Sequence, residues 1–256
     1  MSCVTNRTTR LFRMHDPRRF ETSAAAALVL LHICIDSGAA SAQPSSGSIE
    51  GRLTFSGAPP SPTMLTPDGD SQPVLYVDRS GGLRYAVVYL PDAPRSTTTL
   101  PPPTTLNQHH FIFEPQVLAV RAGQTVQFTN DDPANHNVRA QDSDPANTFS
   151  INTASGAMGR LVHQFAPTPP GHALELSCDI HPWMAAWVYV FEHDQFAVTS
   201  ENGSFRIRDV PPGRYRIAIR QPAGGLARDL TVDVRARETT RLDVRFTQAD
   251  LGVSAR

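Results

Sequence analysis

Three side chains that bind soft metals lie close together in the second half of the chain. They are Cys178, His181 and Met184, with two residues between each neighbouring pair. A thiolate, an imidazole and a thioether are typical of a mononuclear copper site, because copper favours soft sulfur ligands together with imidazole. A strand-like run at 173–177 comes directly before the cysteine. The ligand loop is therefore expected at the end of a strand.

A copper site of this type needs a second imidazole from elsewhere in the chain. His136 offers one, in the polar segment 130–137 that follows a strand-like run at 124–129. The sequence therefore predicts a site for one copper ion that joins two loops. The preceding pair, Asp131 and Asp132, is typical of a turn.

Other metal sites and catalytic sites fit the sequence less well. A dinuclear copper centre needs two bridging cysteines, whereas Cys178 is the only cysteine after residue 42. Structural zinc sites use four firm ligands, and methionine is a poor one. The adjacent His109 and His110 lack a cysteine or carboxylate at ligand spacing, so we expect them at the surface or between domains. No catalytic motif stands out, and we predict that the protein is not an enzyme and has no catalytic residues.

The segment from about 117 to 191 resembles the cupredoxin family, and its short ligand loop is most similar to that of amicyanin. The resemblance implies a type 1 copper ion held by three strong equatorial ligands and one weak axial ligand. The equatorial ligands would be His136, Cys178 and His181, and the axial ligand would be Met184.

Neighbouring residues take supporting roles in this interpretation. Asn137 matches the polar residue that ties the two ligand loops together in cupredoxins. Trp183 is expected to be an apolar cover, and His181 the ligand on the solvent side. Pro133 and Pro182 would then belong to a docking patch around that histidine.

The first 42 residues are predicted to be a signal peptide. Five arginines precede or flank an apolar run at 24–35, which is too short to span a bilayer because spanning needs about 20 residues. The residues at 40–42, Ala-Ser-Ala, form a small-x-small cleavage site. No later segment is apolar enough to span, so we expect a periplasmic or secreted protein. A lone free thiol is open to oxidation in an oxidising compartment. Binding a metal ion would protect Cys178 from it.

The charge of the chain argues against two classes of partner. Its formal net charge is −1 at pH 7, and it has no lysine, so arginine supplies all of its permanently positive side chains. This balance gives no electrostatic basis for binding nucleic acid or an anionic membrane. A redox protein, either a cytochrome or a dehydrogenase, is the partner that a type 1 copper site implies.

The pattern after the signal peptide is all-β, because short alternating runs are broken by turn residues and no long stretch has a helical period. Strands are expected at 48–55, 74–77 and 85–90, followed by a linker rich in proline and threonine at 91–105. The C-terminal part alternates most regularly. Within it, the Glu-Asn-Gly sequence at 201–203 is typical of a type I′ hairpin.

The segment 198–219 resembles the carboxypeptidase regulatory-like, transthyretin-like β-sandwich. Four C-terminal strands are few for a free-standing sandwich, so we expect N-terminal strands to complete it. The alternative is two tandem domains. The expected parts are a signal peptide at 1–42, N-terminal strands at 48–92, a cupredoxin Greek-key β-sandwich at 104–192 and the regulatory-like sandwich at 193–248. The arrangement resembles plastocyanin-like proteins labelled methylamine utilization protein.

Three functions fit these features. The leading hypothesis is an exported one-electron carrier that passes electrons between a dehydrogenase or cytochrome and an acceptor. The first alternative is a periplasmic protein that binds or handles copper without a redox circuit. The second is a binding module for glycan or protein with an accessory copper domain. An intense absorption band near ~600 nm would favour the first, because it requires a short bond between copper and a thiolate.

Overall fold

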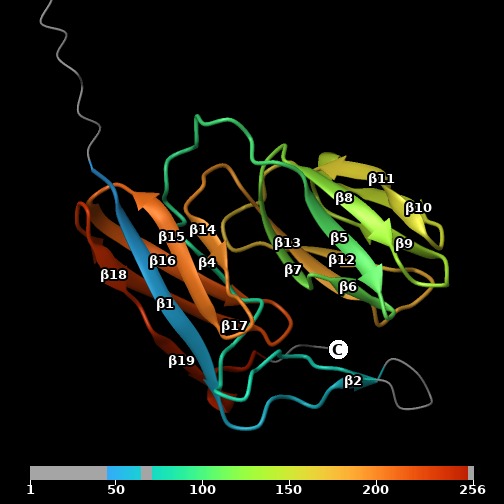
Figure 1. Cartoon of the computed structure of the whole chain (residues 1–256), viewed down its shortest axis with the longest axis horizontal. Coiled ribbons are helices and arrows are strands. Elements are labelled where there is room, and N and C mark those ends of the chain that lie inside the picture. Colours follow the sequence, from blue (N-terminus) through green and yellow to red (C-terminus); the bar gives the residue numbers. More distant parts are fainter. Residues whose placement is uncertain (1–44, 65–70, 253–256) are drawn as a thin grey trace, which may run out of the picture. The chain divides into compact units, whose positions relative to one another are not determined.

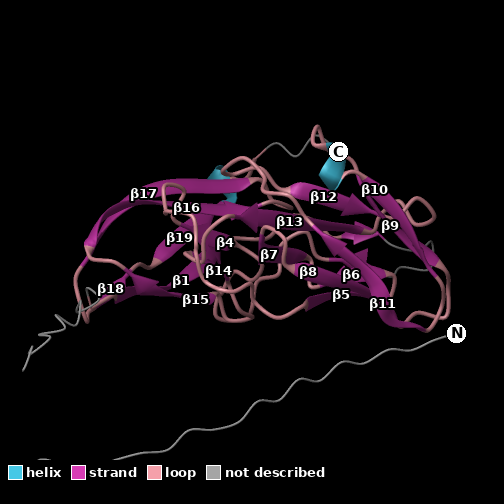
Figure 2. Ribbon diagram, turned by 90° about the horizontal axis from the view of Figure 1, so that it is seen from above, coloured by secondary structure: helices cyan, strands magenta, loops and turns pink. Residues whose placement is uncertain are grey.

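The computed structural model of the chain describes residues 45–64 and 71–252. The predicted signal peptide at 1–42 lies outside them. The described chain is built from strands, with two short 3-10 helices, Pro145–Asn147 and Gln248–Asp250 (Figure 2). In this part of the chain, no helix has the length and apolar character needed to cross a membrane. The all-β expectation is confirmed.

The strands nearest the two ends of the described chain form one β-sandwich. One sheet has the order β15-β1-β18, with β19 also paired to β1, and the other has the order β14-β4-β16-β17. The bounds are β1 Gly47–Ser56, β4 Val87–Tyr89, β14 Phe196–Val198, β15 Ser204–Val210, β16 Gly213–Gln221, β17 Leu226–Val234, β18 Thr239–Arg241 and β19 Val244–Thr247. A separate two-stranded sheet joins β2 Thr63–Met64 to β3 Ser71–Gln72.

This sandwich combines strands that are far apart in the sequence. Strand β1 pairs antiparallel with β15 and parallel with β18 and β19, so it lies among C-terminal strands (Figure 1). Strand β4 lies between β14 and β16. The shared core contains Ile49, Leu53 and Val88 from the N-terminal side, together with Ile217 and Phe246. The N-terminal strands therefore bury apolar surface that the C-terminal strands would otherwise leave open.

The segment between these two parts forms a second sandwich. Its sheets have the orders β10-β9-β12-β13-β7 and β11-β8-β5-β6. The bounds are β5 Thr104–His109, β6 Ile112–Glu114, β7 Val117–Arg121, β8 Thr125–Asn130, β9 His136–Ala140, β10 Phe149–Thr153, β11 Ala157–Gln164, β12 Leu174–Ser177 and β13 Ala185–Phe191. Parallel pairs, β13 with β7 and β5 with β8, occur among antiparallel neighbours. These two sheets enclose one apolar core and form the second β-sandwich that the sequence predicts.

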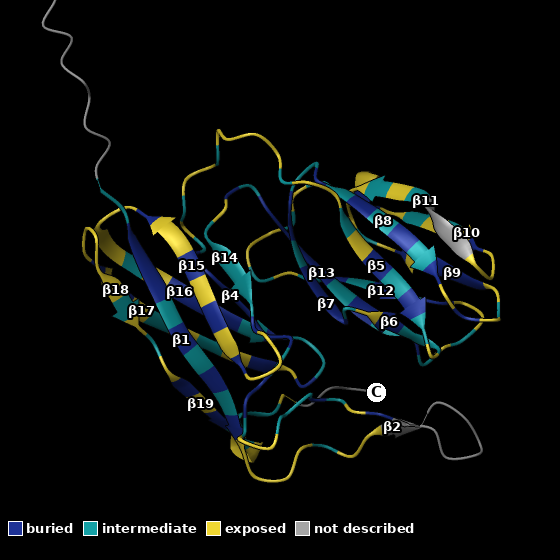
Figure 3. Ribbon diagram, viewed as in Figure 1, coloured by how far each residue is buried: buried dark blue, intermediate teal, exposed yellow. Residues whose placement is uncertain are grey.

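Alternating burial along the strands explains why both sandwiches form (Figure 3). In β8, for example, Val126, Phe128 and Asn130 are buried and their neighbours are half-buried, as expected when one face of a sheet covers a core. Strand β13 is apolar on both faces. Its Val188 faces the second core, whereas Tyr189 belongs to a third apolar cluster with Tyr89 of β4. Both faces of β13 are therefore buried.

Two local expectations were wrong. The segment 74–77 is not a strand, and only Val77 forms a bridge, because the carboxylate of Asp78 accepts bonds from the amides of Ser80 and Gly82 and folds the chain into a loop. The turn at 201–203 does not join paired strands, since β14 and β15 lie in different sheets. Gly203 has φ +80°, and a Cβ there would lie 2.2 Å from the carbonyl oxygen of Leu53. Close packing against β1 therefore requires the glycine.

We predict that residues 193–256 expressed alone will be unfolded or aggregated, because β1 and β4 would be missing from the interiors of their sheets. Residues 104–192 alone should fold and bind copper. Dispersion of the amide signals in a two-dimensional NMR spectrum checks both fragments. A well-dispersed spectrum from isolated 193–256 would contradict the prediction.

Candidate metal centre

The ligand loop is the hairpin connection between β12 and β13. These strands are antiparallel, with Ser177 opposite Ala185, so the seven residues from Cys178 to Met184 form the turn. The amide of Met184 donates to the carbonyl oxygen of His181 at 2.9 Å, which tightens the loop. Cys178 and Met184 are buried in the second core, whereas His181 is half-buried. The loop thus presents two sulfur atoms inward and one imidazole near the surface.

His136 is brought to this loop by the pairing of β9 with β12. Arg139 lies opposite Ser177 in an antiparallel register, so the start of β9 lies beside the residues that follow Cys178. Asn137 fixes the contact, as expected. Its Oδ1 accepts from the amide of Asp179 at 2.7 Å, and its Nδ2 donates to the Asp179 carboxylate at 2.7 Å.

Among the described residues, His136, Cys178 and His181 form a group of three donors that could hold one metal ion. The two Nδ1 atoms are 2.8 Å apart, and the Cys178 Sγ lies 4.0 Å from His136 Nδ1 and 3.7 Å from His181 Nδ1. A point equidistant from the three atoms lies about 2.1 Å from each, within the range of about 2.0–2.3 Å for metal bonds to nitrogen and sulfur. The donors therefore fit a single small ion.

Asp132 sets the tautomer of His136. Its Oδ2 lies 2.8 Å from His136 Nε2, and both side chains are buried. A carboxylate is an acceptor, so Nε2 carries the proton and Nδ1 presents a lone pair to the centre. The sequence interpretation gave Asp132 only a turn role. A carboxylate four residues before a ligand histidine was the available signal.

His181 is also suited to donate a lone pair. Burial lowers its pKa, and nearby His136 adds to this effect while Asp132 opposes it. The imidazole is therefore neutral at pH 7, and protons compete with a metal only below its usual pKa of about 6.5.

Two aromatic residues flank the centre. Trp183 lies with its ring 5.3 Å from that of His181, and its Nε1 donates to the carbonyl oxygen of Phe111 at 3.2 Å. The Phe111 ring stands edge-on to His136 and His181, at 5.5 and 5.2 Å between centroids. Trp183 was expected near the site, whereas Phe111 was missed because it lies about 70 residues earlier and carries no metal-binding group.

The remaining described histidines join no such group. His109 and His110 stack on each other at 3.8 Å, without a third donor that completes a metal cluster. His163 stacks on Phe149 at 4.1 Å. His193 lies against the ring of Phe191, and His172 Nε2 is 3.7 Å from a carboxylate oxygen of Asp142.

Comparison with known proteins gives matches to parts of the chain. The family model for the carboxypeptidase regulatory-like domain matches residues 182–247. That match begins inside the ligand loop and includes β13, which the structure places in the second sandwich. The search of curated proteins found no match.

Several solved structures resemble a part of the chain. A purple cupredoxin from Nitrosopumilus maritimus is 23% identical over 34% of this chain and 99% of its own, with a TM-score of 0.28. Amicyanin from Paracoccus versutus is 14% identical over 41% of this chain and 97% of its own, with a TM-score of 0.29. A copper-containing nitrite reductase from Thermus scotoductus is 25% identical over 40% of this chain and 25% of its own, with a TM-score of 0.30.

We predict that Asp132→Asn will weaken copper binding by about 10- to 100-fold, because a neutral amide no longer fixes the His136 tautomer. Competition with a copper chelator measures the affinity. Asp131→Asn is the matched control, since Asp131 is exposed and its carboxylate accepts from Asn107 Nδ2 at 2.7 Å. Equal affinities for the two variants would contradict the assigned role of Asp132.

Proposed function

We propose that the protein binds one type 1 copper ion and carries single electrons. The observation that supports this most strongly is the triangle of His136, Cys178 and His181 donor atoms around one point. Copper is favoured over zinc because, within the described ranges, three firm donors converge, while the fourth candidate, Met184, is a buried thioether beside them in sequence. A copper ion bound there would accept and release one electron.

Hydrogen bonds within the protein fix the positions of the donor side chains. His136 is fixed by Asp132 on one side and by the β9 backbone on the other. Asn137 connects the two ligand loops, and the hairpin bond from Met184 to His181 limits movement of the second loop. Such rigidity keeps the ligand positions similar in both oxidation states, so little of the protein must rearrange when an electron is transferred.

His181 is the proposed route for the electron, because it is half-buried while the other donors are buried. Ile180 is 55% exposed beside it, and Pro133 and Pro182 are exposed as well. An apolar surface around an electron route suits brief contact with a redox protein. We propose a cytochrome or a dehydrogenase as that partner, in the periplasm or outside the cell. The label methylamine utilization protein stays a prediction and identifies no electron donor.

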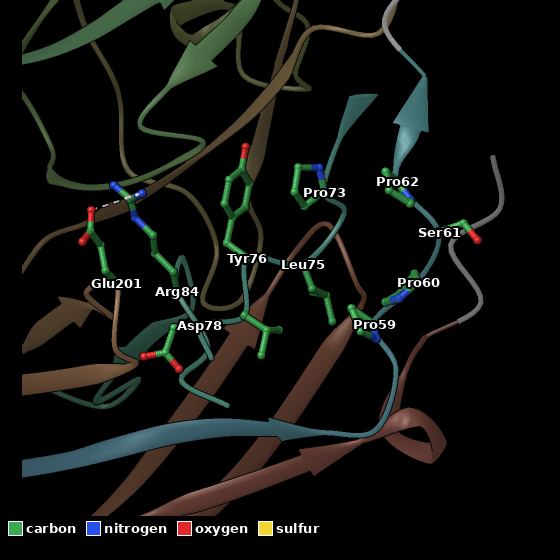
Figure 4. Close-up of a pocket in the computed structure, with 11 residues that line it drawn as sticks. Pro59, Pro60, Ser61, Pro62, Pro73, Leu75, Tyr76, Asp78, Arg84 and Glu201 are labelled. Atoms are coloured by element: carbon green, nitrogen blue, oxygen red, sulfur yellow. Dashed lines mark ion pairs between the residues drawn. The ribbon is translucent and has the colours of Figure 1, made fainter. Parts of the chain in front are cut away.

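A groove in the first sandwich favours a second candidate function, that of a binding module. It has a volume of about 660 Å³, and Figure 4 shows Pro59, Pro60 and Pro62 on one side of it. Tyr76 and the ion pair between Arg84 and Glu201, at 3.7 Å, lie on the other. Proline and tyrosine rings with a charged pair suit a glycan or an extended peptide. Retention on polysaccharide that is unchanged by loss of copper would support this candidate.

We predict that Cys178→Ser will lose tight copper binding and the band near ~600 nm, because a hydroxyl does not replace a thiolate donor. Metal analysis and an absorption spectrum measure both effects. The fold should survive, because the apolar core of the sandwich does not depend on the metal. Circular dichroism checks that the strand content is unchanged. A serine variant with stoichiometric copper and an unchanged spectrum would show that the site assignment is wrong.

We predict that Met184→Leu will keep copper and raise the reduction potential, because loss of a weak axial donor disfavours Cu(II) more than Cu(I). Protein-film voltammetry measures the shift against the wild-type protein. Complete loss of copper would instead show that Met184 is a firm ligand or that the site is not type 1.

A further inference from the structure

The turn between β5 and β6 has an unusual backbone. His109 lies opposite Ile112, and the two residues between them, His110 and Phe111, have φ values of +54° and +59°. Two-residue hairpin turns with positive φ normally use asparagine or glycine. A bulky aromatic residue in this region is a genuine outlier, and such strain persists where the surroundings hold it. The identity of residue 111 is therefore not explained by the turn itself.

The backbone of Phe111 is held by the metal centre. Its amide donates to Asp132 Oδ2 at 2.9 Å, and its carbonyl oxygen accepts from Trp183 Nε1 at 3.2 Å. Asp132 also binds His136, and Trp183 belongs to the ligand loop. Both bonds use backbone atoms of residue 111, so they do not depend on its side chain.

The Phe111 side chain contacts both imidazoles of the centre. Its ring is nearly perpendicular to His136, with an interplanar angle of 85°, and to His181, with an angle of 77°. The His181 ring also lies 5.3 Å from that of Trp183. Together these rings cover the half-buried side of a site whose other donors are buried. An apolar ring there competes with water and small anions for the space beside the donors.

We propose that Phe111 determines the ligand specificity of the centre by capping it against water and small anions. This inference rests on the proposed copper site. The strained turn places the apolar ring of Phe111 over the two histidines, so that only side chains of the protein coordinate the metal.

Azide is the probe, because it is a small anion that binds Cu(II) where a coordination position is accessible. The copper-loaded full chain is titrated with azide and followed by absorption, in the wild type and in Phe111→Asn and Phe111→Leu. Asparagine tolerates positive φ and removes the ring, whereas leucine keeps an apolar side chain in the strained conformation. We expect azide to bind Phe111→Asn at least tenfold more tightly than either the wild type or Phe111→Leu.

Thermal unfolding of the metal-free proteins separates capping from a structural role. We expect the midpoint of Phe111→Asn to lie within about 3 °C of the wild type or above it, since relief of strain offsets the lost ring contacts. A midpoint lowered by more than about 10 °C, or azide exclusion equal to the wild type with copper retained, would overturn the proposal. Azide binding by the wild type as tight as that by Phe111→Asn would overturn it as well. Absence of the thiolate-to-copper band in the wild type would overturn the copper site and the cap together, whereas the other results reject only the cap.

Discussion

The antiparallel register of β9 against β12 is the constraint on which the centre depends. With Arg139 opposite Ser177, His136 lies next to the loop that carries Cys178 and His181. A slip by one residue would turn Val138 and Ala140 out of the core and His136 away from the cysteine. The two bonds between Asn137 and Asp179 hold this register at the point where regular pairing ends.

The second sandwich must bury polar groups in order to bring the donors together. His136, Asp132 and Cys178 are all buried, and a buried polar group is costly unless it is paired. Asp132 is paired twice, with His136 and with the amide of Phe111. The two Nδ1 atoms, however, face each other at 2.8 Å, so a proton or a metal ion must lie between them. A metal ion bound there would use the lone pairs of both nitrogens.

Residue types and spacing predicted the all-β class and the three donors that converge, His136, Cys178 and His181, but much less of what surrounds them. The donor positions follow from chemistry that few residue types can perform, and the loop from Cys178 to Met184 is short enough to be read directly. Phe111 acts through contacts that form only when the β5–β6 turn reaches the ligand loops, and nothing local in the sequence indicates them. Asp132, in contrast, lies only four residues before His136. The Glu-Asn-Gly turn was predicted correctly as a turn, but its neighbours join opposite sheets because β1 packs against Gly203. Local turn chemistry does not specify which strands pair.

The most direct test of the copper assignment is the extended X-ray absorption fine structure of the protein loaded with one equivalent of copper. We expect two nitrogen scatterers at about 2.0 Å and one sulfur scatterer at about 2.3 Å or less, the distances typical of imidazole and thiolate ligands. A first shell made only of nitrogen and oxygen would contradict it, because Cys178 would then lie outside the coordination sphere.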